Sequence, residues 1–154
     1  MTAIRGEARA EGLRVAIVVS RYHETVTRRL LDGALAGVRE KGGDSGSVTV
    51  VEVPGAFEIP AAARALARAK RHDAIVCLGA VVRGETPHFD YVCAETSRGI
   101  AEIALEGEVG VGFGLLTTET LDQAAERAGG RVGNKGWEAA VAAFEMASLL
   151  RKLR

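Results

Sequence analysis

Short apolar runs rich in β-branched residues alternate along the chain with amphipathic stretches of helical period. The apolar runs cover residues 13–19, 47–53, 73–82 and 109–116. Near-continuous apolar runs of this length are typical of strands that are buried on both faces, as in a parallel sheet. The pattern therefore predicts four core strands.

The stretches between and after these runs fit α-helices. Five helices are predicted, over residues 24–41, 60–71, 88–105, 121–128 and 136–153. Gly42 and Gly43 suit the end of the first helix, and Asn134 suits the N-cap of the last. Strand–helix alternation predicts right-handed βαβ units. We expect an α/β fold, a three-layer αβα sandwich of the flavodoxin-like kind, with helices on both faces of a four-stranded parallel sheet.

The composition narrows the class of protein. The chain has 154 residues, which fits a single domain over 1–154. It is 47% apolar but only 5% aromatic, so Ala, Val, Leu and Gly must form the core. Lys+Arg and Asp+Glu are 20 each, and this zero net charge argues against a general nucleic-acid binder.

The two cysteines and the absence of long apolar stretches point to a protein of the cytoplasm. Cys77 lies in an apolar run and is expected to be a buried free thiol. No apolar stretch approaches 18 residues and no charged-then-apolar leader opens the chain, so neither a membrane partner nor export is expected. No Cys/His group has the spacing of a metal site.

Ligands of open α/β sheets bind beyond the carboxyl ends of the strands. The segments at those positions are 20–23, 54–58, 83–88 and 117–119, and the third is the densest polar cluster. Gly84 allows a turn that presents N–H groups, and the following helix N-terminus suits a phosphate. His88 would stand beside that anion, where an imidazole is suited to proton transfer. The alternative is a helix cap with an exposed histidine.

Other candidates also allow two interpretations. Tyr22, Phe57 and Phe113 are suited to stacking on a flat ring, although aromatics are more often core. Glu58 follows a buried-looking segment and needs a partner, which either ligand hydroxyls or a helix N-terminus would supply. Arg127 alone fits a solvated cation at a helix C-terminus. His23 and His72 are expected at the surface, and residues 129–136 do not match a phosphate loop.

Four long motifs, taken together, resemble one enzyme family. They are VPGAFEIP at 53–60, LGAVVRGETPHFDY at 78–91, GLLTTE at 114–119 and the glycine-rich segment 126–136. In this order and spacing they resemble the lumazine synthases of riboflavin biosynthesis, over residues 13–150. That family condenses 5-amino-6-(D-ribitylamino)uracil with 3,4-dihydroxy-2-butanone 4-phosphate to 6,7-dimethyl-8-ribityllumazine, phosphate and water. The resemblance implies no metal and no redox cofactor.

The resemblance also implies roles for particular residues. For the ribitylaminouracil it implies contacts from Tyr22, Ala56, Phe57, Glu58, Ala80, Val81, Val82, Phe113 and Lys135. For the butanone phosphate it implies Glu85, Thr86 and Arg127. Tyr22 would stack on the pyrimidine ring, Glu58 would accept from ribityl hydroxyls, and residues 80–82 would act largely through their backbone. Phe113 would come from a neighbouring subunit, and His88 is the implied proton-transfer residue.

Two residues depart from the commonest pattern of the family. His23 stands where many members have Asn, although His also occurs there. Glu85 puts a carboxylate next to the expected phosphate site. If only its backbone contacts the anion this is harmless, whereas an inward side chain would lower phosphate affinity.

The family forms pentamers, and in some members twelve pentamers build a sixty-subunit icosahedral shell. The absence of an insertion in residues 129–136 favours the shell here. Residues 1–12 resemble the family's N-terminal arm, which joins a neighbour's sheet. Two other hypotheses remain beside the enzyme: a flavin- or lumazine-binding protein with weak catalysis, and a shell that encloses riboflavin synthase. The presence of both His88 and Arg127 favours the enzyme.

Overall fold

A parallel four-stranded sheet forms the centre of the protein, as the alternating pattern predicts. The computed structural model describes residues 1–154. The strands are β1 (Val15–Ser20), β2 (Thr49–Val53), β3 (Ala74–Val82) and β4 (Gly110–Thr118), in the spatial order β2-β1-β3-β4. Five α-helices flank the sheet: α1 (Glu24–Glu40), α2 (Ile59–Arg68), α3 (His88–Leu105), α4 (Leu121–Glu126) and α5 (Lys135–Leu153).

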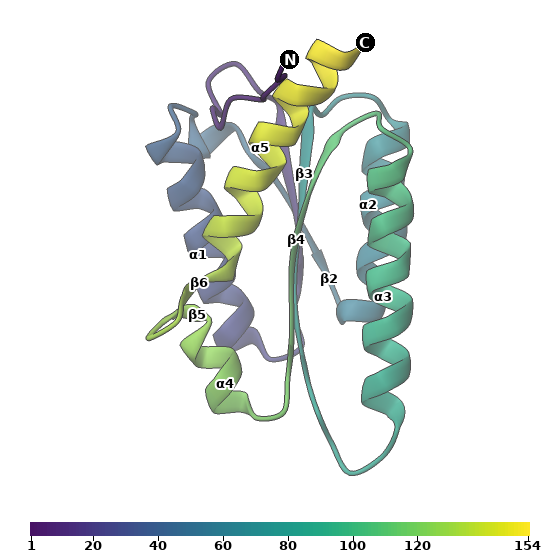
Figure 1. The fold of residues 1–154 in the computed structure, drawn as a ribbon. Helices are drawn as coiled ribbons and strands as arrows, with labels where there is room; N and C mark the ends of the chain where they lie inside the picture. The colour runs from purple at the N-terminus through teal and green to yellow at the C-terminus, as the bar shows by residue number, and fades with distance from the viewer.

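The helices cover both faces of the sheet. Helices α1, α4 and α5 lie on one side of the strands, and α2 and α3 lie on the other (Figure 1). This is the three-layer αβα arrangement of flavodoxin-like folds, so the predicted fold class is confirmed. Two short 3₁₀ helices, η1 (Ser45–Ser47) and η2 (Ala56–Glu58), lead into β2 and α2.

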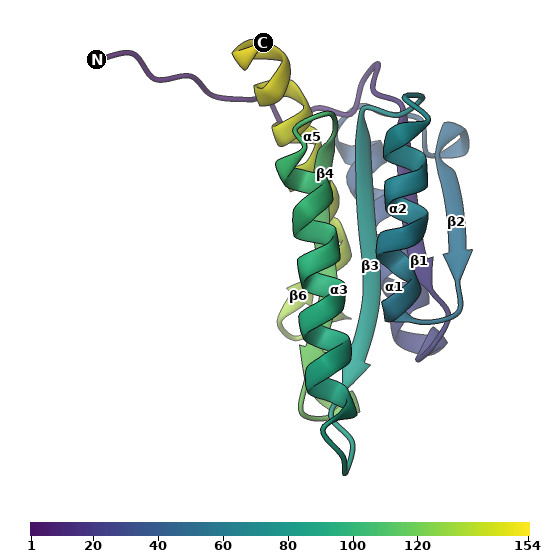
Figure 2. The same cartoon turned by 90° about the vertical axis from the view of Figure 1, so that its right-hand side faces the viewer.

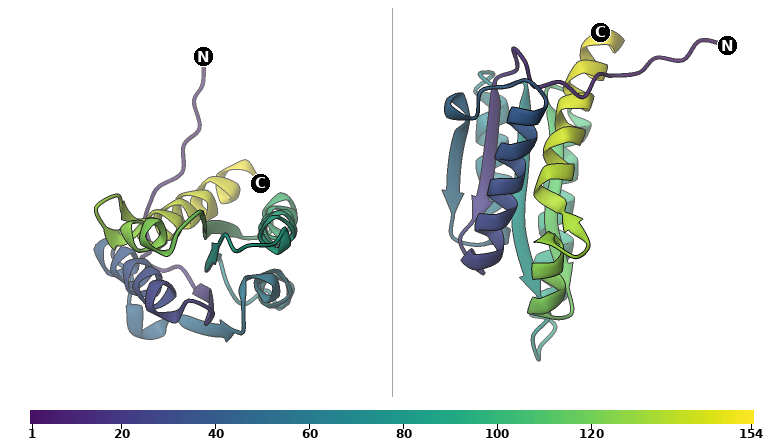
Figure 3. Two further views of the ribbon diagram at one scale, coloured as in Figure 1. Left: turned by 90° about the horizontal axis from the view of Figure 1, so that it is seen from below. Right: turned by 90° about the vertical axis from the view of Figure 1, so that its left-hand side faces the viewer.

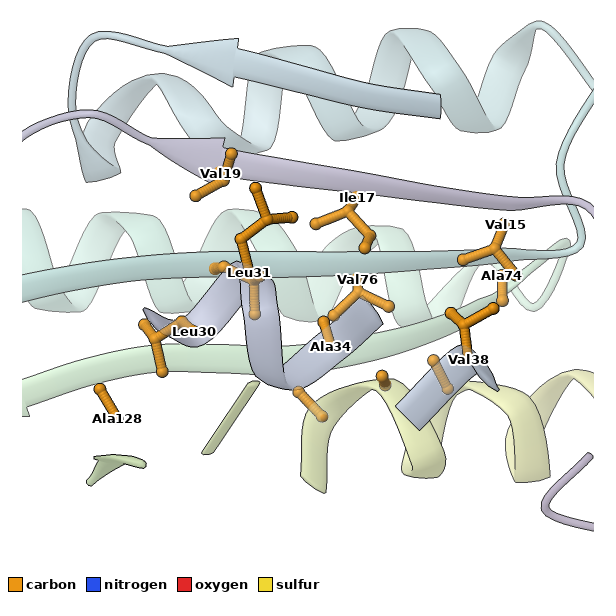
Figure 4. Close-up of a cluster of buried hydrophobic side chains, with 14 of the residues drawn as sticks. Val15, Ile17, Val19, Leu30, Leu31, Ala34, Val38, Ala74, Val76 and Ala128 are labelled. Carbon is orange, nitrogen blue, oxygen red and sulfur yellow. The ribbon is translucent and has the colours of Figure 1, made fainter. Parts of the chain in front are cut away.

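The apolar runs are strands because both of their faces are covered. In β1, Val15, Ile17 and Val19 join the hydrophobic cluster beneath α1 and α5, part of which Figure 4 shows. Ala16 and Val18 point the other way and join the cluster beneath α2 and α3. Every residue of β1 is buried, so no polar face interrupts the run.

Small residues let α5 lie directly on β4. A Cβ atom at Gly110 would lie 2.2 Å from the carbonyl oxygen of Ala143, and one at Gly112 would lie 2.2 Å from that of Ala139. No side chain larger than hydrogen fits at these strand positions while the helix stays where it is. This close approach explains how a core with so few aromatic residues is still filled.

Two helices end two or more residues before the predicted position. Helix α2 ends at Arg68, and Lys70 turns into the left-handed region with a φ of 56°, so the predicted continuation to residue 71 is wrong. Helix α4 ends at Glu126, short of the predicted residue 128. There the chain enters an unpredicted antiparallel hairpin of β5 (Ala128–Gly130) and β6 (Gly133–Asn134).

Cys77 is a free, fully buried thiol, as predicted. It lies in the middle of β3, and burial raises its pKa to about 12. No cation stands close enough to offset that effect. The thiol is therefore a small apolar core group and not a nucleophile.

The two termini lie at the end of the molecule where the strands begin. Figure 2 shows the first residues extending away from the body beside the C-terminal end of α5, and Figure 3 shows the same arm from two further sides. The arm touches α5 through a hydrogen bond from the Glu7 N–H to Ser148 Oγ (3.1 Å) and one from Lys152 Nζ to the Arg5 carbonyl (2.7 Å). None of the helices combines the length and apolarity needed to cross a membrane.

Candidate active site

A pocket of about 870 Å³ opens at the carboxyl ends of the strands, on the side of α2 and α3. It is lined by the segment after β1, by η2, by the end of β3 with the loop that follows it, and by the first turns of α3. That loop projects at the bottom of Figure 1. From β1 the chain passes to β2 on one side and later to β3 on the other, so the pocket lies at the switch point of the sheet.

Most of the residues that the sequence selects line this one pocket. They are Tyr22, Ala56, Phe57, Glu58, Ala80, Val81, Val82, Thr86 and His88. Tyr22 is 68% exposed and Phe57 is 62% exposed, which is unusual for large rings. These rings do not pack in the core, so the alternative interpretation of them as core residues is wrong.

Glu58 occupies the N-cap position of α2, yet its side chain makes no capping hydrogen bond. The carboxylate folds towards Gly55, where an added Cβ would lie 3.3 Å from Glu58 Oε1. Glu58 does lie at the helix N-terminus, as one of its two interpretations predicted. Because the carboxylate does not cap the helix, its oxygen atoms stay available to hydroxyl groups of a ligand.

The end of β3 offers free backbone groups to the pocket. Strand β3 pairs with β1 only as far as Val19↔Leu78, but it pairs with β4 as far as Val82↔Thr118. The residues of β3 beyond Leu78 therefore have no strand partner on the β1 side, and three of them line the pocket. Backbone N–H and C=O groups exposed in this way are ready to pair with a ligand.

Helix α3 begins at His88 beside the pocket. Its N-cap is Pro87, which makes no side-chain cap, so the first N–H groups of the helix are not capped by a side chain. Gly84 and Thr86 of the preceding loop line the pocket, whereas the exposed Glu85 does not. An uncapped helix N-terminus of this length attracts anions.

Four residues that the sequence selects are not brought into the pocket of this chain: Glu85, Phe113, Arg127 and Lys135. Phe113 is 46% exposed on β4, the last strand of the sheet. Arg127 donates to the Gln123 carbonyl (3.0 Å), and its own carbonyl accepts from the Lys135 N–H (2.8 Å). The hairpin β5–β6 thus holds Arg127 and Lys135 together, away from the pocket.

The pocket also contains residues to which the sequence assigned no substrate contact. They are His23, Gly55, Arg83, Gly84, Phe89, Tyr91, Val92 and Glu95, of which Gly84 was expected as the turn residue of the phosphate site. In the wall formed by α3, the helical spacing of His88, Val92 and Glu95 places them on one face of the helix, but it does not show that this face meets a pocket. His23 was expected at the surface, but it lines the pocket in a left-handed conformation (φ 60°), with its ring edge-on to Tyr22.

The other histidine expected at the surface, His72, is half-buried at the opposite end of the sheet. Its Nε2 lies 3.3 Å from Thr49 Oγ1, and its Nδ1 is buried without a partner. Burial lowers the pKa of His72, and the charges of Arg14 and Arg71 lower it further. No group of three or more His, Cys, Asp or Glu side chains is arranged to hold a metal ion.

The fold and the pocket are those of a flavodoxin-like α/β protein with a small-molecule site at the switch point of its sheet. A family model for 6,7-dimethyl-8-ribityllumazine synthase matches residues 12–151, and the chain belongs to this family. It is therefore a transferase that forms 6,7-dimethyl-8-ribityllumazine in riboflavin biosynthesis, as the four motifs indicate. The interpretation as a binding protein with weak catalysis is not favoured.

Proposed function

We propose that the pocket beside α3 is where 5-amino-6-(D-ribitylamino)uracil and 3,4-dihydroxy-2-butanone 4-phosphate are condensed. The observation that carries this proposal is that Tyr22, Glu58, Thr86 and His88 line one pocket of about 870 Å³. That volume is in the range of small-molecule sites and leaves room for both substrates at once. Holding them side by side removes much of the entropic cost of a bimolecular step.

The pyrimidine substrate occupies the side of the pocket formed by β1, η2 and β3. The exposed ring of Tyr22 stacks on the heterocycle, with Phe57 and Ala56 beside the ribityl chain. The uncapped carboxylate of Glu58 accepts hydrogen bonds from the ribityl hydroxyls. Backbone groups of Ala80, Val81 and Val82 on the side away from β4, which have no strand partner, contact the polar edge of the ring.

The phosphate group of the second substrate lies at the N-terminus of α3. Backbone N–H groups of Glu85 and Thr86 and the uncapped first turn of the helix bind it. Glu85 is exposed and does not line the pocket, so we propose that its side chain points to solvent and its charge does little harm. His88, at the start of the same helix, moves protons as the imine forms, phosphate leaves and the ring closes.

Phe113, Arg127 and Lys135 reach the substrates from a neighbouring copy of the chain. Each of them lies outside the pocket of its own chain. The arginine that does line this pocket, Arg83, is already bonded to Glu119 and Asp90. A departing phosphate needs a further cation, and Arg127 of a second copy supplies it. A site completed in this way makes the protein a homo-oligomer, and we propose the pentamer of the family.

The pentamers assemble into a sixty-subunit icosahedral shell in the cytoplasm. The short hairpin over residues 128–134, without any insertion, supports this arrangement. The chain is one domain over 1–154, and its arm, residues 1–12, is free at its tip to pair with a neighbour, because Ile4 is 55% exposed. Riboflavin synthase is a candidate for the enclosed partner. Light scattering of the purified protein distinguishes a single pentamer from a shell.

Substrate-resolved kinetics test the division of the pocket. Arg127→Ala should raise the KM of the butanone phosphate by about tenfold to a hundredfold, since a hydrogen bond to a charged group contributes about 1.5–3 kcal/mol. Glu58→Gln should raise mainly the KM of the ribitylaminouracil. Lumazine fluorescence with one substrate varied at a time measures both. If each variant affected the opposite substrate, the assignment would be wrong.

A further inference from the structure

Arg83, at the exit of β3, is held by two carboxylates and one aromatic ring. Its Nε donates to Glu119 Oε2 at 2.7 Å, and its Nη1 donates to Asp90 Oδ1 at 3.4 Å. The centre of the guanidinium lies 4.4 Å from the centroid of the Phe89 ring, a cation–π distance. We refer to Arg83 with Glu119, Asp90 and Phe89 as the Arg83 clasp.

The clasp joins two segments that are far apart in the sequence. Asp90 and Phe89 belong to the first turn of α3, directly after His88. Glu119 belongs to the connection between β4 and α4. Its own N–H donates to Gln123 Oε1 at 2.9 Å, so the connection is anchored on the first turn of α4. The clasp therefore fixes the start of α3 against the start of α4.

The charges of the clasp point to positioning and not to substrate binding. Arg83 lines the pocket, but two carboxylates already face its guanidinium. The hydrogen bond to Glu119 raises the pKa of Arg83, which is consistent with a stable ion pair between the two side chains. Without Arg83, the carboxylates of Glu119 and Asp90 would stand unpaired beside the helix end that receives the phosphate.

Loss of the Arg83 clasp should affect the stability of the fold and the rate of catalysis to different extents. All three charged side chains are substantially exposed, at 40% for Arg83, 61% for Glu119 and 60% for Asp90. Exposed ion pairs contribute little to stability. Displacing a reacting group by about 1 Å, in contrast, costs about a hundredfold in rate. The clasp is therefore placed to matter for the rate more than for the fold.

We propose that Arg83 is a positioning residue for the condensation, which holds the first turn of α3 against the β4–α4 connection and so sets the place of His88 in the pocket. The proposal rests on the role proposed above for His88. It assigns Arg83 no contact with either substrate.

Arg83→Met tests the proposal, because it removes the guanidinium and keeps an unbranched apolar side chain. We expect kcat to fall by about tenfold to a hundredfold while the KM of the ribitylaminouracil stays within about twofold. The two carboxylates left unpaired raise the KM of the butanone phosphate by less than kcat falls. Arg83→Lys should restore only part of kcat, because an ammonium group lacks the planar fork that reaches two carboxylates. The matched control is Arg64→Met, which removes an exposed ion pair with Glu106 at the far end of α3 (3.6 Å) and should leave kcat unchanged.

A second variant separates positioning from direct binding. If Arg83 acts through Glu119, Glu119→Gln should also lower kcat. The double variant Arg83→Met/Glu119→Gln should then be no slower than Arg83→Met alone. A rise in the KM of the butanone phosphate in Arg83→Met, with kcat unchanged, would show direct phosphate binding and overturn the proposal. Unchanged kinetics in either Arg83→Met or Glu119→Gln would also overturn it.

The failure of this proposal is distinguishable from a failure of the proposed function. His88→Ala is assayed in parallel under the same conditions. Slow turnover in His88→Ala together with normal turnover in Arg83→Met removes only the clasp from the mechanism. Normal turnover in His88→Ala removes the role of His88 itself. Circular dichroism and the thermal midpoint report whether each variant is folded. If Arg83→Met does not fold, the kinetics of Glu119→Gln test the proposal instead.

Discussion

Polar side chains gather at both ends of the sheet, and the two ends differ in how those side chains are paired. At the amino ends of the strands, the Asp73 carboxylate is only 12% exposed and is bound by two arginines. Arg14 donates to it from Nε (3.2 Å), Nη2 (3.0 Å) and its backbone N–H (2.8 Å), and Arg151 Nη2 lies 2.9 Å away. Burial tends to raise the pKa of Asp73, but the Arg14 hydrogen bonds and both positive charges outweigh it and hold that pKa below its ordinary value.

At the carboxyl ends Arg83 is paired, but several other groups around the pocket have no partner within the chain. Glu58 has a helix-cap position and makes no cap, and α3 starts at His88 with uncapped N–H groups. These groups surround a pocket of about 870 Å³. Groups paired within the chain stabilise the fold, whereas groups left free around a cavity are paired only when a ligand arrives. We therefore refer to the amino ends of the strands as the stabilising end of the sheet and to the carboxyl ends, where the proposed site lies, as the functional end.

The largest expected effect comes from His88 at the functional end. His88→Ala should lower kcat by about 10²- to 10⁴-fold, the usual contribution of general acid–base catalysis. The thermal midpoint should not change, because His88 is exposed at the start of α3. Steady-state lumazine formation and a thermal melt measure the two quantities.

His72→Gln is the matched control at the stabilising end, since it changes a histidine remote from the pocket. It should leave kcat unchanged. An equal loss of kcat in both histidine variants would erase the distinction between the two ends.

The next effect concerns Asp73 at the stabilising end. Asp73→Asn should lower the free energy of unfolding by about 2 kcal/mol, because hydrogen bonds between charged groups are lost from a mostly buried site. The kcat should stay as in the wild type. Urea unfolding at fixed protein concentration measures the change, and Glu106→Gln, in an exposed pair with Arg64, should cost much less. An equal loss of unfolding free energy in Asp73→Asn and Glu106→Gln would contradict the greater stabilisation assigned to Asp73.

The smallest effect is the pH dependence of the stability that Asp73 contributes. Because the folded pKa of Asp73 lies below its unfolded value of about 3.9, its stabilisation is complete above that value and is lost as the pH falls through the folded pKa. The stability difference between wild type and Asp73→Asn should therefore shrink from about pH 5 to about pH 3. Unfolding curves at several pH values measure it, and a difference that grows towards acid would contradict the pairing.

Much of the candidate site was predictable because it lies on local elements in a known topology. Tyr22, Glu58 and His88 each follow the end of an apolar run, and parallel strands bring their carboxyl ends to one edge. The α3 wall with Phe89, Tyr91, Val92 and Glu95 was not recognised, since its orientation depends on how the helix packs on the sheet. Periodicity alone shows which residues share a helix face, not which face meets a cavity.

The sequence by itself determined the αβα fold, the order of its elements and the family. Apolar runs and helical periods are local properties, and the covered sheet faces follow from them. Only the tertiary structure decided where α2 stops, that residues 128–134 form a hairpin, and that Arg127 and Lys135 lie outside the pocket of their own chain. The pairing of Arg83 with Glu119, and that of Asp73 with Arg151, is also visible only in the tertiary structure. These pairs are distant along the chain, and their energies depend on a separation that the pattern of neighbouring residues does not fix.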